Sequence, residues 1–306
     1  MKILVTGGAG YIGTKLIKQL AKSDKIESIV VYDNLSRGNF NLFIGEEIVD
    51  GSKLKFVQGD ILDSRLLRKS LEGIDYVYHL AAKVTTPFAN TDPHFFEQIN
   101  HWGTAELVYA IEDSNVKKLI HLSSTSVYGS SDNVVDETSP LNPRTFYGVA
   151  KKRAEGHVNR LMKKGRAITI RSGNVYGYSK SMRFDAVINR YAFETNFHGR
   201  ITIQGSGKQN RSFIHVNDLV LNLALLINNE VPHDIYNMVS KNMSILDLAD
   251  NFKSLRPDLE FLFVDQHLDL RNIIVNTDLK LANYLDMVKP RSIEEELKEF
   301  LGNFSY

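Results

Sequence analysis

Tyr147 and Lys151 stand four residues apart, in a stretch with helical spacing that runs to about Lys163. On a helix this spacing places both side chains on one face. A tyrosine with a reference pKa of ~10 is a poor base at neutral pH. A neighbouring ammonium favours the phenolate and lowers that pKa. The pair therefore predicts proton exchange with a hydroxyl group, with Ser124 as the hydrogen-bond partner that fixes the geometry.

The Y-x-x-x-K spacing alone is weak, because Tyr11/Lys15 and Tyr176/Lys180 also satisfy it. Position favours the pair at 147 and 151, which follows the apolar run KLIHLSS that ends at Ser124. Open α/β sheets place ligands at the carboxyl ends of their strands. The alternative is a Tyr–Lys pair on the surface of an amphipathic helix.

A glycine array follows the first apolar run, KILVT, and places Gly7, Gly10 and Gly13 at intervals of three residues. In a dinucleotide-binding turn the first glycine permits the tight bend, the second admits the pyrophosphate, and the third lets helix and strand pack closely. The next helix would offer free N–H groups to the phosphates. A glycine-rich turn without a ligand is the alternative.

Two carboxylates at strand ends extend this prediction. Asp33 ends the run SIVVY, 20 residues after Gly13, near the ~20-residue offset expected for the acid that binds the adenosine ribose. A carboxylate there repels a 2′-phosphate, which favours NAD over NADP, although Arg37 lies close by. Asp60 and Ile61 follow the third run, where an adenine contact is expected; a helix N-cap is an equal alternative for Asp60.

The elements that must position these residues alternate in type. Short β-branched runs at 2–6, 28–32, 53–57, 75–80, 118–123 and 167–171 are separated by helical stretches such as 12–22 and 105–113. This alternation predicts βαβ units, a parallel sheet and a doubly wound α/β (Rossmann) fold. We expect a dinucleotide-binding domain at 1–174, with later returns near 213–240, and a smaller mixed α/β substrate-binding lobe mainly at 175–306.

Composition narrows the classes of partner. The 306 residues carry 37 Lys and Arg against 36 Asp and Glu, which indicates neither nucleic acid nor an anionic membrane as a partner. The absence of cysteine excludes disulfides and thiolate metal sites, and the histidines show no metal-ligand spacing. No secretion signal or membrane-spanning run is visible, so a cytoplasmic location without a bound metal is expected.

Eight ordered motifs together resemble the extended short-chain dehydrogenase/reductase family, in its branch of nucleotide-sugar epimerases and dehydratases, of which UDP-galactose 4-epimerase is typical. They span residues 6 to about 218 and read TGGAGYIG, YDN, QGDI, HLAA, SSTSVYG, YGVAK, RSGNVYG and RSFIHVND. The resemblance implies NAD as cofactor, a nucleotide-diphosphate sugar as substrate and a homodimer, for which the helical stretch near 95–112 is a candidate face.

The resemblance also implies site residues. Ser124, Tyr147 and Lys151 would be catalytic. The implied cofactor contacts are Gly7, Gly10, Tyr11, Ile12, Gly13, Asp33, Asn34, Asp60, Ile61, Leu80, Ala81, Ala82, Tyr147 and Lys151. The implied substrate contacts are Ser124, Thr125, Tyr147, Asn174, Arg211 and Arg271, with the two arginines on the pyrophosphate.

Three departures from the family pattern bear on this assignment. Ser212 replaces an Asp after Arg211, Tyr178 replaces a Pro, and Gly173 stands where Phe is common. The segment GYSKSMRFD (177–185) is similar to a subgroup active on modified hexoses or heptoses, which argues against naming one sugar.

The expected function is epimerisation through oxidation of a ring hydroxyl, at C4 by preference, to a transient ketone. The alternative is a net 4-dehydrogenase or 4-reductase of a nucleotide-linked hexose or heptose, and a third hypothesis is a catalytically inactive dinucleotide-binding sensor. The dehydratases place Asp-Glu after the catalytic Thr, where this chain has Thr125 and Ser126. We therefore expect no 4,6-dehydratase activity.

Overall fold

A computed structural model of the chain describes residues 1–44, 51–84, 92–265 and 270–304. Within these residues the main element is a seven-stranded sheet with the order β11-β7-β5-β4-β1-β2-β3. Every neighbouring pair in it is parallel. Its strands are β1 (Lys2–Thr6), β2 (Ser28–Asp33), β3 (Leu54–Gln58), β4 (Tyr76–His79), β5 (Lys118–Ser124), β7 (Ala167–Ser172) and β11 (Ile235–Met238).

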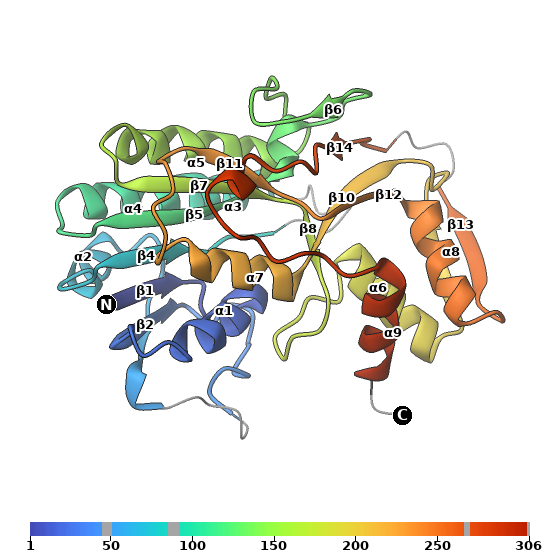
Figure 1. Cartoon of the computed structure of the whole chain (residues 1–306), viewed down its shortest axis with the longest axis horizontal. Helices are drawn as coiled ribbons and strands as arrows, with labels where there is room; N and C mark the ends of the chain where they lie inside the picture. The colour runs from blue at the N-terminus through green and yellow to red at the C-terminus, as the bar shows by residue number, and fades with distance from the viewer. Residues whose placement is uncertain (45–50, 85–91, 266–269, 305–306) are drawn as a thin grey trace.

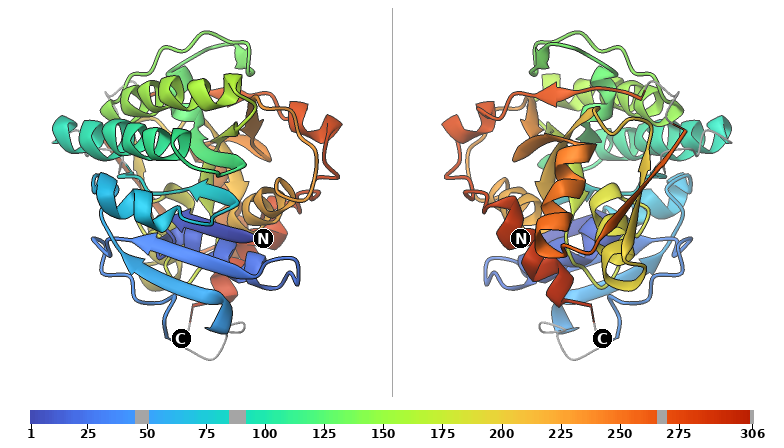
Figure 2. Two further views of the ribbon diagram at one scale, coloured as in Figure 1. Left: turned by 90° about the vertical axis from the view of Figure 1, so that its left-hand side faces the viewer. Right: turned by 90° about the vertical axis from the view of Figure 1, so that its right-hand side faces the viewer.

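Helices cover both faces of this sheet, so its central strands are apolar on both sides (Figure 1). One face packs against α1 (Tyr11–Ala21) and α7 (Val216–Leu225). The other packs against α2 (Ser64–Ser70), α4 (Gly103–Glu112) and α5 (Phe146–Lys163). Figure 2 shows α4 and α5 side by side over the sheet in its left view. They are preceded by α3 (Pro93–Phe96) and a π-helical turn, η2 (Glu97–Trp102).

A smaller lobe lies beyond the carboxyl ends of the strands and faces the viewer in the right-hand view of Figure 2. Its helices α6 (Val187–Phe197), α8 (Ile245–Leu255) and α9 (Ile293–Gly302) share an apolar core. Its strands are β8 (Asn174–Tyr176), β9 (Arg200–Gln204), β10 (Asn210–His215), β12 (Lys241–Ser244) and β13 (Glu260–Val264). The remaining elements are the pair β6 (Val134–Val135) and β14 (Ile274–Val275) and the 3-10 turns η1 (Gly51–Lys53), η3 (Thr125–Tyr128) and η4 (Lys280–Asn283).

The predicted doubly wound α/β fold is confirmed. The sheet order reverses beside β1, which pairs with β2 on one side and β4 on the other. Such a reversal leaves a crevice at the carboxyl ends of the strands, where ligands bind in this class of fold. The division at residue 174 stays a prediction, although β11 does return to the large sheet as its edge strand.

Candidate active site

A cavity of about 720 Å³ lies at the carboxyl edge of the sheet and extends into the smaller lobe. This is a typical size for a ligand site. Its walls come from both halves of the chain. They include all the predicted cofactor contacts: Gly7, Gly10, Tyr11, Ile12, Gly13, Asp33, Asn34, Asp60, Ile61, Leu80, Ala81, Ala82, Tyr147 and Lys151.

The glycine turn between β1 and α1 is shaped by backbone contacts that no side chain would allow. Gly7 has a φ of +70°, and a Cβ there would lie 2.6 Å from the backbone nitrogen of Ala81. A Cβ on Gly13 would lie 2.4 Å from the carbonyl oxygen of Gly7. Helix α1 begins after Gly10 without a side-chain cap. Its first N–H groups and its positive dipole end suit a pyrophosphate, so these residues fit a dinucleotide.

Asp33 is held by backbone N–H groups at the end of β2. Its Oδ2 accepts from the nitrogen of Ala9 (3.0 Å) and its Oδ1 from that of Leu35 (2.8 Å). These bonds fix the carboxylate at the cavity wall, and its remaining lone pairs suit ribose hydroxyls. Arg37 lines the same region.

Asp60 has a local structural role at the same end of the cavity. Its side chain accepts from the backbone nitrogen of Leu62 (2.9 Å) and from the Asn34 amide (2.9 Å). The N-cap of α2 is Asp63, whose Oδ1 accepts from Leu66. The alternative interpretation of Asp60 as the helix cap is therefore wrong.

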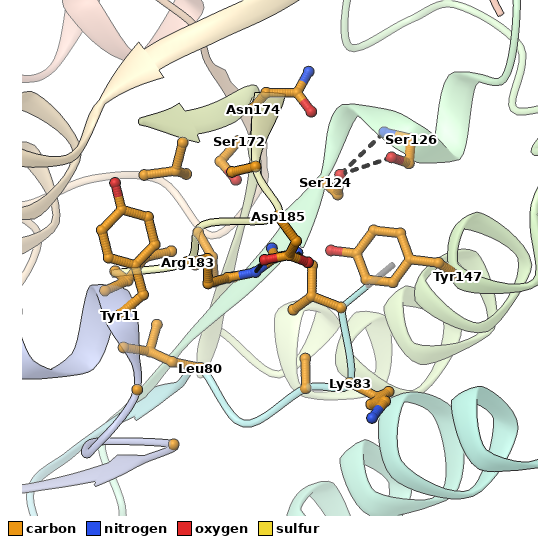
Figure 3. Close-up of a pocket in the computed structure, with 18 of the residues that line it drawn as sticks. Tyr11, Leu80, Lys83, Ser124, Ser126, Tyr147, Ser172, Asn174, Arg183 and Asp185 are labelled. Carbon is orange, nitrogen blue, oxygen red and sulfur yellow. Dashed lines mark hydrogen bonds and ion pairs between the residues drawn. The ribbon is translucent and has the colours of Figure 1, made fainter. Parts of the chain in front are cut away.

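Tyr147 and Lys151 lie on the first turns of α5, which Thr145 caps by accepting from the nitrogen of Gly148 (3.1 Å). Figure 3 shows the Tyr147 hydroxyl directed into the cavity, on the same side as Ser124 at the end of β5. The Lys151 ammonium donates to the carbonyl oxygen of Leu122 (2.8 Å). Helix α5 and the end of β5 thus bring Ser124, Tyr147 and Lys151 to one wall of the cavity.

The pKa of Tyr147 differs in direction from the sequence-based expectation. Burial of the hydroxyl end raises this pKa and outweighs the three groups that lower it, a hydrogen bond with Ser124 and the charges of Arg183 and Arg271. Burial also lowers the pKa of Lys151 to about 8. The protein groups alone therefore do not make the phenol acidic, and Lys151 is not among the groups that lower its pKa.

The two other Y-x-x-x-K pairs are engaged elsewhere in the structure. The Tyr11 hydroxyl donates to the carbonyl oxygen of Gly177 (2.6 Å), and Lys15 donates to Asn217 (2.8 Å). The Tyr176 hydroxyl hydrogen-bonds to Glu296. Of the three pairs, only Tyr147 and Lys151 on α5 both line the cavity; Lys15 and Lys180 do not.

Arg211 and Arg271 also line the cavity. Burial lowers the pKa of both, and the charge of Arg271 lowers that of Arg211 further. Within the described residues neither has a carboxylate in ion-pair contact; Arg211 donates to the carbonyl oxygen of Asn210 (3.0 Å). Two guanidinium groups held near each other suit a dianion such as a diphosphate. Asn174 also lines this region, and its amide donates to the carbonyl oxygen of Ser212 (2.9 Å).

Thr125 lies behind the cavity wall. It is buried, its hydroxyl is 3.3 Å from that of Ser212, and it is not part of the lining. Its neighbour Ser126 does line the cavity. The backbone nitrogen and the hydroxyl of Ser126 each lie 3.1 Å from the Ser124 hydroxyl oxygen. A 3-10 turn follows β5, so the residue directly after Ser124 turns inward. The prediction that Thr125 contacts substrate does not fit this geometry, since Ser126 and not Thr125 lines the cavity.

Arg183 and Asp185 form an ion pair in the cavity that sequence reasoning did not select. Their Nη2 and Oδ2 atoms are 2.5 Å apart, and Nε and Oδ1 are 3.0 Å apart. Figure 3 shows the pair between Tyr11 and Tyr147. The motif GYSKSMRFD contains both, but spacing alone does not reveal that this segment turns back over the reacting residues.

A parallel sheet with a glycine turn, a strand-end acid and a Ser–Tyr–Lys trio in one cavity defines a dinucleotide-binding enzyme. Comparison with known families agrees: residues 3–238 match the NAD dependent epimerase/dehydratase family. The chain belongs to this family, which confirms the predicted family, the NAD-dependent redox chemistry and the enzyme class.

Individual relatives divide between two reactions. The chain is 30% identical over 298 residues to a dTDP-D-glucose 4,6-dehydratase of Homo sapiens, covering 95% of this chain and 79% of that protein. It is 33% identical to a UDP-glucose 4-epimerase of Mycolicibacterium smegmatis, covering 72% and 71%. The structure of a UDP-glucuronic acid 4-epimerase from Bacillus cereus, in complex with UDP-glucuronic acid and NAD, superposes with a TM-score of 0.86 at 26% identity, covering 99% and 98%.

Proposed function

We propose that this chain is an NAD-dependent nucleotide-sugar 4-epimerase. The observation that carries the proposal is that one cavity joins the glycine turn, the Ser124–Tyr147–Lys151 wall and the Arg211–Arg271 pair. A nucleotide-sugar whose diphosphate lies between the two arginines would place its sugar toward Tyr147. The catalytic roles of the trio and the binding roles of the lining residues are part of this proposal.

The residues of the trio divide the work of proton transfer. Tyr147 takes the proton from the sugar hydroxyl and later returns it, and Ser124 holds the hydroxyl by a hydrogen bond. NAD, which the glycine turn and Asp33 would hold, would supply reversible hydride transfer at the ring carbon, and its positive nicotinamide would add to the charges that favour the phenolate. Lys151, one helical turn after Tyr147, fixes α5 against β5 through its hydrogen bond to the carbonyl oxygen of Leu122. Epimerisation results when the ring presents its other face before the proton and hydride return.

The cavity argues against dehydration. Among the described residues its carboxylates are Asp33, Asp60 and Asp185, of which the first two lie at the predicted adenosine end and the third is paired with Arg183. Thr125 and Ser126 replace the acid–base pair that elimination of water requires. With dTDP-glucose we expect no 4-keto-6-deoxy product.

The test incubates the purified protein with UDP-glucose, UDP-glucuronic acid, UDP-N-acetylglucosamine and dTDP-glucose, and follows products by NMR and NADH by absorbance. We expect the C4 epimer of at least one substrate, with many turnovers and no net NADH. Stoichiometric NADH and a released keto-sugar would favour the dehydrogenase alternative instead. Tyr147→Phe serves as the control, with retained cofactor and a loss of turnover of about 10²–10⁴-fold; unchanged turnover would argue against the mechanism.

We further propose a homodimer formed through the helical stretch near 95–112, which contains η2 and α4. Trp102, the last residue of η2, is half-exposed, and a closed two-fold pair would cover it. Light scattering of the wild type and of Trp102→Asp tests this: a dimer that becomes monomeric supports it, and a monomeric wild type contradicts it. No helix among the described residues is long and apolar enough to cross a membrane; the cytoplasmic location stays a prediction.

A further inference from the structure

Directly beneath the candidate active site lies a buried ion pair, Glu155–Arg171. Both side chains are almost fully enclosed, at 6% and 3% exposure. The guanidinium contacts the carboxylate twice, from Nε to Oε1 (3.0 Å) and from Nη2 to Oε2 (2.7 Å). The Ser123 hydroxyl donates to the same Oε1 at 2.5 Å. Arg171 also donates to the Tyr128 hydroxyl (3.0 Å) and lies over its ring.

Each member of this cluster is a close neighbour of a cavity residue. Ser123 precedes Ser124 on β5, Arg171 precedes Ser172 on β7, and Glu155 follows Lys151 by one turn of α5. Ser123 and Arg171 are also register partners across the two strands. One carboxylate therefore connects the three elements that carry the reacting wall.

Net stability is a weak explanation for such a pair. Removing two charges from water is costly, and well-packed apolar residues often replace a buried ion pair without loss. A directional network does, however, fix the relative positions of the elements that it joins. We propose that Glu155, with Arg171, is a positioning residue of the active site: it sets α5 against β5 and β7 and holds a carboxylate one helical turn from the Lys151 ammonium. This inference rests on the proposed function of Lys151.

The electrostatic surroundings of Lys151 support the second part. Burial lowers its pKa, and the charge of Glu155 on the same helix raises it. From β4 and β5 the facing groups are His79 and His121, whose own pKa values are lowered by burial and by the charge of Lys151, so both stay neutral near pH 7. From β7 the facing charge is Arg171. Among the described residues, Glu155 is therefore the anion whose charge opposes the lowering of the Lys151 pKa by burial.

The test measures the Lys151 titration directly, by ¹⁵N NMR of the side-chain nitrogens in lysine-labelled full-length protein. Lys151→Arg assigns its signal. The variant is Glu155→Gln, which keeps the shape and removes the charge. The matched control is Glu112→Gln, which removes the same charge from an ion pair that joins α4 to Arg160 of α5 at the protein surface. Folding is verified by circular dichroism.

We expect Glu155→Gln to lower the Lys151 pKa by about one unit or more, a shift usual for loss of a nearby charge. The control should leave it unchanged. Turnover on the substrate found above should fall at least about tenfold at pH 7, with NAD affinity kept within about twofold, because a small misplacement of reacting groups is costly. A folded Glu155→Gln protein with an unchanged Lys151 pKa would overturn the proposal, whether or not any nucleotide-sugar is turned over.

If Glu155→Gln does not fold, the double variant Glu155→Met/Arg171→Met replaces the whole pair with apolar side chains, a change that buried ion pairs tolerate. The proposal then requires the loss of turnover together with a smaller downward shift of the Lys151 pKa, because the double variant removes the positive charge of Arg171 as well as the negative charge of Glu155. A folded double variant with wild-type titration and turnover would refute it.

Discussion

Gly7 allows the glycine turn to be tested by one added methyl group. In Gly7→Ala the new Cβ would lie 2.6 Å from the backbone nitrogen and 2.7 Å from the Cα of Ala81, and 2.9 Å from the carbonyl carbon of Leu80. All three atoms belong to the backbone that leaves β4, so no side chain can rotate away. Gly73 offers the matched control, because it has nearly the same φ (+72°) and nothing within 4 Å of its added Cβ.

The two substitutions share the cost of a left-handed backbone and differ in the overlap. That conformation costs an L-residue about 1–2 kcal/mol, partly offset by about 0.4–1 kcal/mol from the less flexible unfolded chain. Gly73→Ala should therefore lower the free energy of unfolding by roughly 1 kcal/mol or less. Overpacking adds about 1–3 kcal/mol, so Gly7→Ala should lower the free energy of unfolding by about 1–4 kcal/mol.

The assays are urea unfolding followed by fluorescence and titration with NAD by calorimetry. Displacement of the turn also moves the N–H groups that would receive the pyrophosphate, so Gly7→Ala should weaken NAD binding at least about tenfold. Gly73→Ala should bind NAD like the wild type. The reasoning about the turn is refuted if the two variants are equally stable and bind NAD equally well.

Two further perturbations address other parts of the cavity, and a third addresses the buried carboxyl of Asp218 on α7. Arg211→Gln should raise KM for the nucleotide-sugar about 10–100-fold, because a charge-assisted phosphate contact is lost; calorimetry should show unchanged NAD affinity, and an unchanged KM would contradict the diphosphate assignment. Arg183→Ala removes a charge that lowers the pKa of Tyr147, so the acidic limb of the pH–rate profile should move to higher pH, whereas Arg183→Lys should leave it in place. Burial raises the pKa of Asp218 to about 6, so the native carboxyl binds its proton more tightly than the unfolded one and the free energy of unfolding falls as the pH rises from about 4 to 6. The wild type should show a decline of about 1–3 kcal/mol across this range in urea unfolding, and Asp218→Asn should lack it. An identical pH dependence of the two proteins would contradict this.

The fold and the cofactor half of the site could be predicted because local rules determine them. Strands buried on both faces require continuous β-branched runs, and the tight turn after β1 requires glycine, so both leave direct marks in the sequence. The offset from Gly13 to Asp33 follows from the length of one βαβ unit. The predicted strands agree with β1, β2, β3, β4, β5 and β7 to within a residue or two.

The substrate half was harder for a physical reason. Its residues come from segments whose relative positions depend on tertiary packing rather than on periodicity. Thr125 and Ser126 differ only in how the 3-10 turn after β5 directs them, and the sequence does not encode that direction locally. Arg183 and Asp185 reach the cavity because their segment is anchored from both sides, by the Tyr11 bond to Gly177 and by Asn189, which donates to the carbonyl oxygen of Arg183 (2.9 Å).

The distribution of charge along the cavity gives a reason for the orientation of the substrate. Arg211 and Arg271 have no carboxylate in ion-pair contact among the described residues, so their positive charge is available to a ligand. Arg183, whose charge also acts on Tyr147, is balanced by Asp185. A dianionic diphosphate is therefore drawn to the arginine pair, and an uncharged sugar ring meets Tyr147 without an electrostatic penalty. The binding energy of the diphosphate then positions the ring for proton transfer, which ties selection of the substrate to catalysis.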